Sequence, residues 1–233
     1  MAKIKRAEDL FWPTPGHLVE TITNLDAIPI AENGEPLIVL QTAFPALIIR
    51  PLGKREEADT SLWARESVGS RLVNAQERLS ASQTGLQLVV VDAWRPPGEQ
   101  RKWHRRARIL FRLLHPTWPA ALIREAANKY VAAPDAVAPP PHSTGGAIDV
   151  RLWDKQGKEI PMGRWTGGAA RTEFENLPEE QRANRRLLRD AMEAAGFSNY
   201  EEEWWHYSYG DSGWALRTNR ETAFFGRTAP PTV

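Results

Sequence analysis

The sequence predicts an α+β protein in which helices flank a central antiparallel or mixed sheet. Apolar, β-branched runs indicate strands, and the clearest of them spans residues 86–92. Other stretches repeat their apolar residues with a period of roughly 3.6, which is typical of amphipathic helices. These strands and helices alternate irregularly along the chain, so a regular βαβ arrangement is not expected.

The size and composition of the chain limit the kind of protein it can be. Its 233 residues suffice for one well-buried domain, and its formal net charge of +1 gives no sign of a nucleic-acid partner. A basic cluster within residues 101–112 is interpreted as a solvated helix face. No run reaches the roughly 18 apolar residues of a membrane span, and no apolar stretch follows the basic N-terminus as in a signal peptide. We therefore expect a cytoplasmic protein with no membrane partner, and a homo-oligomer stays open.

In the first half of the chain, strands are expected at residues 37–40 and 46–49, each bounded by turn-forming residues. The pattern over 61–82 predicts a helix that Gly85 ends. The β-branched run 86–92 then suits a strand at the centre of the sheet.

In the second half, two helices at 99–114 and 120–131 are expected to pack against each other. A loop over 132–141 leads into a short alternating strand at 147–152. A further helix starts near residue 177 and is closed by Gly196. The aromatic stretch 197–209 is expected to be strand-like, and the tail after residue 230 to fray.

The sharpest chemical signal lies where the loop meets the strand at 147–152. His142 is followed by the glycines Gly145 and Gly146, which allow backbone conformations or close approaches that a side chain would forbid. On the strand, Asp149 faces away from the apolar row formed by its neighbours. A carboxylate on a buried strand face needs a partner such as a metal ion or an arginine.

Because the chain has no cysteine, any metal must be held by histidine or carboxylate side chains. His206 lies in an aromatic, acidic stretch, and taken alone it is more often an interior histidine than a ligand. Together with His142 and Asp149 it completes a common three-ligand set for catalytic zinc. Glu203 would then be placed to act as general base on a water held by the zinc. On an ideal strand Glu203 and His206 face opposite sides, so they converge only if the chain bends between them.

Arg95 is a further candidate because it ends the central strand. A fixed arginine there could bind an oxyanion through two hydrogen bonds. On local sequence alone, pairing with a structural acid such as Asp92 is an equal alternative.

These pieces resemble the D-alanyl-D-alanine dipeptidases, which are VanX-type zinc peptidases of peptidase family M15. The family pattern Ser-x-His-x-x-Gly-x-Ala-x-Asp is matched in spacing at His142, Gly145, Ala147 and Asp149. The Glu-x-x-His motif is matched by Glu203-Trp204-Trp205-His206. The aspartate-aromatic-Arg-Pro motif is matched by Asp92-Ala93-Trp94-Arg95-Pro96. The resemblance covers about residues 60–210 of a single domain 1–233, with 1–60 as a variable N-terminal part and 211–233 as a C-terminal extension.

The resemblance implies a hedgehog/D-Ala-D-Ala-peptidase-like fold whose sheet carries one Zn²⁺ per chain. The implied ligands are His142, Asp149 and His206. It further implies that Glu203 is the catalytic base and that Arg95 stabilises the transition state. The expected activity is hydrolysis of a small peptide, D-Ala-D-Ala or a related dipeptide, through a zinc-bound water activated by Glu203.

The chain departs from the family pattern in the parts that recognise substrate. Pro140 stands where the family has serine, and no N-terminal tyrosine corresponds to the one that helps the family's amine site. Residues 162–167 lack the aspartate that holds the substrate amine in the family, for which Glu173 and Glu175 are weak substitutes. Two alternatives follow: a carboxypeptidase or amidase of the same fold acting on a larger peptidoglycan fragment or specialised metabolite, and a non-catalytic zinc-binding module.

Overall fold

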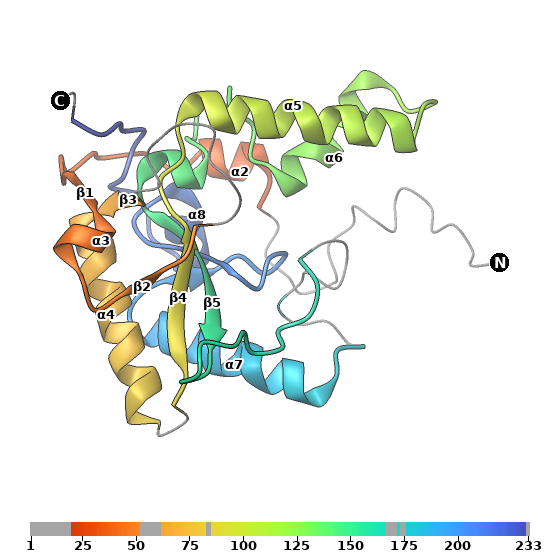
Figure 1. The fold of residues 1–233 in the computed structure, drawn as a ribbon. Coiled ribbons are helices and arrows are strands. Elements are labelled where there is room, and N and C mark those ends of the chain that lie inside the picture. The colour runs from red at the N-terminus through yellow and green to blue at the C-terminus, as the bar shows by residue number, and fades with distance from the viewer. Residues whose placement is uncertain (1–19, 52–61, 83–84, 166–171, 173–175, 232–233) are drawn as a thin grey trace.

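A five-stranded mixed sheet forms the centre of the computed structural model, which describes residues 20–51, 62–82, 85–165, 172 and 176–231 (Figure 1). The strands run in the order β2 (Ile48–Ile49), β4 (Gln87–Asp92), β5 (Ala147–Trp153), β7 (His206–Ser208) and β6 (Ser198–Asn199). Only the β2–β4 pair is parallel among these. The predicted α+β class with a mixed sheet flanked by helices is therefore confirmed.

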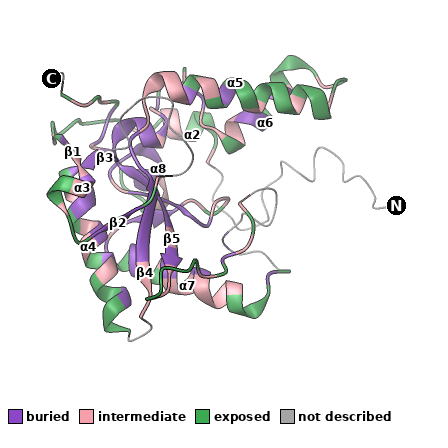
Figure 2. Cartoon of the chain, viewed as in Figure 1, coloured by how far each residue is buried: buried purple, intermediate pink, exposed green. Residues whose placement is uncertain are grey.

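The apolar core lies on one face of this sheet, against α4 (Glu66–Ala81) and α7 (Glu179–Ala194). On β5, Ile148, Val150 and Leu152 alternate toward that core and are fully buried. Figure 2 shows β4 and β5 as mostly buried. Burying each such side chain stabilises the fold by roughly 1.5–3 kcal/mol, so the strand register is held firmly and Asp149 is fixed on the opposite face.

The predicted helix over 61–82 begins later than expected. Residues 63–65 form β3 (Trp63–Arg65), which pairs antiparallel with β1 (Leu37–Val39) in a separate two-stranded sheet. The helical apolar period continues into this segment, but its backbone is committed to β1, so α4 starts at Glu66. The predicted strand 37–40 likewise ends at Val39 because a short helix, α3 (Leu40–Ala43), follows at once.

Two further helices, α5 (Pro97–Leu114) and α6 (Ala120–Tyr130), pack on each other as predicted and project beyond the sheet (Figure 1). Their contact includes a hydrogen bond of 2.8 Å between His104 Nε2 and Asn128 Oδ1. It also includes the rings of Phe111 and Tyr130, whose centroids are 5.5 Å apart. We call this pair of helices the α5–α6 arm.

The aromatic stretch 197–209 is only partly strand. It forms the short strands β6 and β7, and the residues between them make turns instead of the continuous strand expected. Besides α3, the helices α2 (Ile22–Asp26) and α8 (Ser212–Arg217) were not predicted, and these two lie against each other. Both are too short to show a clear apolar period. The last residues of the tail, 232–233, lie outside the described residues.

The C-terminal segment returns to the loop that carries His142. Thr228 N donates to Ser143 O at 3.1 Å, and its carbonyl accepts from Trp94 Nε1 at 3.0 Å. These bonds connect the C-terminal segment, the end of β4 and the histidine loop, so the extension takes part in holding the site.

Gly145 and Gly146 each occupy a position that favours glycine, as the sequence indicated, but for two different reasons. Gly145 has φ of +74°, which favours glycine. Gly146 has an ordinary φ, but a Cβ there would lie 2.4 Å from the backbone oxygen of Tyr209. This turn lets the chain pass directly from the histidine loop into β5.

Replacing Gly146 by alanine is expected to destabilise the fold by about 1–3 kcal/mol, because the opposing atom is a backbone carbonyl that cannot swing away. Chemical denaturation measures the change in the free energy of unfolding. Gly98→Ala is the matched control, since a Cβ at Gly98 would have nothing within 4 Å. Equal stability of the two variants would contradict the packing argument.

Candidate metal centre and active site

His142 is held by a short 3-10 helix, η1 (Pro141–Thr144), at the end of the proline-rich loop. Its Nδ1 lies 2.7 Å from the carbonyl oxygen of Ala93. A carbonyl can only accept, so Nδ1 carries the hydrogen and Nε2 keeps a free lone pair. A backbone carbonyl that fixes the tautomer of a histidine in this way is typical of metal ligands.

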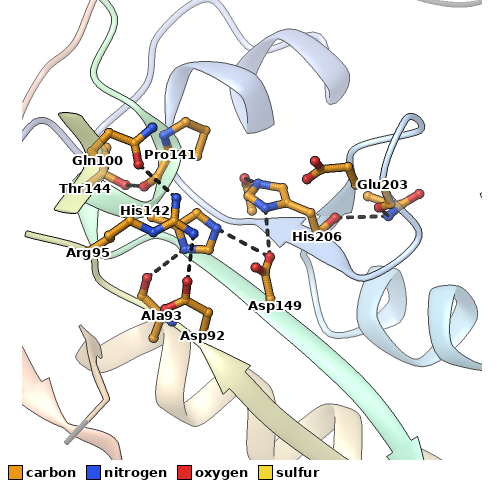
Figure 3. A network of polar contacts seen from close by, with 12 residues as sticks. Asp92, Ala93, Arg95, Gln100, Pro141, His142, Thr144, Asp149, Glu203 and His206 are labelled. Carbon is orange, nitrogen blue, oxygen red and sulfur yellow. Dashed lines mark hydrogen bonds and ion pairs between the residues drawn. The ribbon is translucent and has the colours of Figure 1, made fainter. Parts of the chain in front are cut away.

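Asp149 and His206 face each other across the β5–β7 pair, where they are direct partners in the register. His206 Nδ1 lies 3.0 Å from Asp149 Oδ1, and His142 Nε2 lies 3.4 Å from the same oxygen. One ligand atom from each residue falls within 4.8 Å of the others, and all three side chains are buried. Figure 3 shows them pointing toward one another.

This geometry fits a zinc ion. Zinc bonds to nitrogen and oxygen are about 2.0–2.2 Å long, which places tetrahedral ligand atoms roughly 3.3–3.6 Å apart. The two separations at Asp149 Oδ1 lie close to that range. The protein thus supplies a buried set of two nitrogens and one oxygen, as the sequence predicted, and such a set leaves a tetrahedral position for water or substrate.

Glu203 reaches the site through a double turn. Glu203 N donates to Tyr200 O at 2.8 Å, and His206 N donates to Glu203 O at 3.1 Å. The bend that the sequence required between Glu203 and His206 is therefore present, and β7 begins only at His206. Figure 3 places the Glu203 side chain beside His206, on the side away from His142. Unlike the three buried side chains, Glu203 is partly accessible.

The pKa values of the two acids in the site, Glu203 and Asp149, are shifted in opposite directions. Burial raises the pKa of Glu203 well above its ordinary value, and the negative charge of Asp149 adds to the effect while Arg95 opposes it. Burial would also raise the pKa of Asp149, but His142 and His206 lower it below its ordinary value. Two carboxyl groups separated in this way are suited to different tasks, one as a permanent anion and one as a proton carrier.

Arg95 is paired with a structural acid, which is one of the two alternatives that its sequence left open. It donates to Asp92 Oδ2 at 2.7 Å and to Gln100 Oε1 at 2.9 Å, and its guanidinium lies 4.9 Å from the ring centroid of Trp103. It is thus fixed by a structural acid, and its backbone N donates to His142 O at 3.0 Å.

The charge of Arg95 also interacts with the carboxylates of the site. Burial would lower its pKa, but the carboxylates of Asp92 and Asp149 raise it overall. Glu203 makes a smaller contribution in the same direction. The guanidinium is consequently a permanent cation on the His142 side of the cluster (Figure 3).

Three groups that shape the site were not found from the sequence. They are the carbonyl of Ala93, the amide of Gln100 and the ring of Trp103. Gln100 and Trp103 lie in the first two turns of α5, directly after Arg95, and that position was the only available signal. The weak candidates Glu173 and Glu175 lie outside the described residues, so their role as amine partners stays a prediction.

A buried His, Asp, His set beside an acid and a fixed arginine, on a mixed sheet, defines a metal-dependent hydrolase. Comparison with known proteins makes the class specific. Residues 53–224 match the peptidase M15 family, described as D-ala-D-ala dipeptidase. The chain belongs to this family, and the predicted metallopeptidase class is confirmed.

Individual relatives agree with the family. A D-alanyl-D-alanine dipeptidase of Synechocystis sp. (strain ATCC 27184 / PCC 6803 / Kazusa) is 29% identical over 86% of this chain and 95% of its own length. One from Escherichia coli (strain K12) is 28% identical over 54% of this chain and 57% of its own length. Among solved structures, the zinc complex of the vancomycin-resistance D,D-pentapeptidase VanY is 16% identical, with a TM-score of 0.45 over 84% of this chain and 96% of that chain.

None of the helices in the described ranges is long and apolar enough to cross a membrane.

Proposed function

We propose that this protein is a zinc-dependent dipeptidase that cleaves D-alanyl-D-alanine into two molecules of D-alanine. One zinc ion per chain would be held by His142 Nε2, Asp149 Oδ1 and His206 Nδ1. The observation that carries the proposal is the convergence of one ligand atom from each of these three residues within 4.8 Å in a member of the D-Ala-D-Ala dipeptidase family. Names of the relatives, which are D-alanyl-D-alanine dipeptidases, support the choice of substrate.

The metal and the side chains have separate roles in the proposed reaction. When bound, zinc supplies Lewis-acid polarisation of the scissile carbonyl and makes a water easier to deprotonate. Glu203 takes a proton from the attacking water as the new C–O bond forms. It then gives that proton to the leaving nitrogen as the C–N bond breaks, so one water is consumed and two amino acids are released. The raised pKa of Glu203 suits this task, since the carboxyl must both accept and return a proton.

Arg95 is proposed to donate hydrogen bonds to the oxygen that becomes negative during the attack. Asp92 and Gln100 already orient its guanidinium, so no reorganisation is needed when that charge develops.

Replacing Arg95 by lysine is expected to lower kcat by about 10²–10³-fold with little change in KM, because a lysine cannot bond both orienting groups and still present a planar donor pair. Steady-state kinetics on D-Ala-D-Ala measures both constants. Arg101→Lys, on the exposed face of α5, is the control and should retain activity. A variant at Arg95 that keeps its kcat would contradict the proposed role.

The proposal is tested by metal analysis followed by a peptide panel. The purified protein should hold about one zinc per chain, and it should cleave D-Ala-D-Ala faster than L-Ala-L-Ala, N-acetyl-D-Ala-D-Ala or a pentapeptide ending in D-Ala-D-Ala. Bound zinc together with cleavage of none of these peptides would overturn the dipeptidase and instead favour the non-catalytic zinc module.

A second candidate function is a carboxypeptidase or amidase acting on a larger peptidoglycan fragment or a specialised metabolite. It is favoured by residues 162–167, which read Met-Gly-Arg-Trp-Thr-Gly and offer no acid for a free amino group. In that segment Trp165 stacks on Trp205 with ring centroids 4.5 Å apart. Preference for the N-acetylated or longer peptides would select this function over the dipeptidase.

A further inference from the structure

The α5–α6 arm is strongly basic, although the net charge of the whole chain is close to zero. Residues 97–130 contain eight lysine or arginine residues and two acidic residues, a net charge of +6. The whole chain has a net charge of only +1, so the remaining residues sum to −5. Charge is thus segregated, with the arm strongly basic and the rest of the protein acidic.

The sides of α5 differ in exposure and in residue type. The side that faces the rest of the protein carries residues at helical spacing, including Gln100 and His104, which are buried. A stripe of four arginines follows the same spacing on an exposed side of the helix: Arg101, Arg105, Arg108 and Arg112. The neighbouring side over the last two turns is apolar.

That apolar side is unusually open to solvent. Its four side chains are more than half exposed: Ile109 at 53%, Leu110 at 53%, Leu113 at 74% and Leu114 at 60%. Figure 2 shows α5 as largely exposed toward its C-terminal end, which Figure 1 places away from the sheet. Clustered exposed aliphatic side chains of this size mark an interaction surface more often than a solvated helix face.

The combination of the two sides identifies the partner. An identical arm is a poor partner, because two surfaces of net charge +6 repel each other. A nucleic acid would satisfy the arginines but leave the four aliphatic side chains without a role. A helix with an apolar side and flanking arginines matches the interface of an anionic lipid bilayer, where the apolar side chains enter the acyl boundary and the guanidinium groups stay among the head groups.

We propose that the outer end of the α5–α6 arm docks on an anionic lipid surface. No membrane partner was expected from the sequence, because no run is long enough to span a bilayer. Peripheral docking needs only the exposed side of one helix. The 18 residues of α5 extend about 27 Å, so a membrane at its far end leaves the site beside Gln100 open to water-borne peptides.

Co-sedimentation of the full chain with vesicles tests the proposal. Binding is expected to phosphatidylcholine vesicles that contain about 30% phosphatidylglycerol, and to be weak on pure phosphatidylcholine. It should fall when NaCl rises from about 0.1 M to about 0.5 M, because salt screens the arginine contribution. No binding to anionic vesicles, or equal binding to both kinds, would overturn the proposal.

Paired variants separate the two sides of the helix. Leu110→Gln with Leu113→Gln, and separately Arg105→Gln with Arg108→Gln, should each reduce partitioning onto anionic vesicles by about tenfold or more. Ile22→Gln, an exposed apolar position on α2, is the matched control and should bind as the parent does. Hydrolysis of D-Ala-D-Ala in solution should be unchanged in all of them, which separates this inference from the proposed function.

Light scattering identifies the competing occupant. If the parent chain is a dimer and the Leu110→Gln, Leu113→Gln variant is a monomer, the surface belongs to a second copy and the lipid proposal is wrong. A parent chain and variant of the same mass, together with lipid binding only by the parent, supports it.

Discussion

Glu203→Gln is expected to lower kcat for D-Ala-D-Ala hydrolysis by about 10²–10⁴-fold while the metal stays bound. The amide keeps the shape of the side chain and the two turns around it, but it can neither accept a proton from water nor return one to the leaving nitrogen. Glu203 is not one of the three residues whose ligand atoms converge at the metal centre. Kinetics and elemental metal analysis of the same preparation therefore measure the two effects separately.

The loss should not come from unfolding. Burial raises the pKa of Glu203, so its ionised form costs free energy in the folded metal-free protein, and the amide removes that cost. We expect the free energy of unfolding to be unchanged or higher in the variant. Glu201→Gln makes the same chemical change at an exposed position two residues earlier and should keep full activity. Wild-type turnover by the Glu203 variant would rule out its role as base.

The metal centre could be predicted because its signals are local. His142 and Asp149 are seven residues apart on either side of a Gly-Gly pair, which indicates a turn in the sequence, although the contact that requires Gly146 is visible only in the structure. The pairing of Asp149 with His206, 57 residues later, is a matter of strand register. Before the structure, these two segments were linked by the ligand types that catalytic zinc prefers and by the resemblance to a family.

Features set by tertiary contacts could not be predicted. The backbone of Trp63–Arg65 follows its partner strand instead of its own helical period. The hydrogen bond from His142 to Ala93 O depends on where β4 ends relative to η1, and a carbonyl carries no sequence signal. Likewise, the helical spacing of residues 101–114 predicts an amphipathic helix, but which side stays open depends on the packing of α6.

The second large effect is expected at the metal itself, where His206→Ala should abolish stoichiometric zinc binding and with it activity. The variant leaves one histidine and one carboxylate, and Asp149 loses the ligand partner that lies 3.0 Å away. Elemental analysis after gel filtration should show well below one zinc per chain, against about one for the parent. Circular dichroism checks that the variant is folded.

Thermal unfolding gives an independent measure of the same site. Added zinc should raise the Tm of the metal-free parent by mass action, about 2.7 kcal/mol of stabilisation at a hundredfold excess over Kd, and should leave the variant unchanged. His115→Ala is the matched control, because His115 stacks on Trp118 in the connection between α5 and α6, with ring centroids 3.7 Å apart, and is not among the converging ligands. A His206 variant that binds one zinc per chain and is stabilised as much as the parent would show that the buried triad is structural, and that the zinc ligands lie elsewhere.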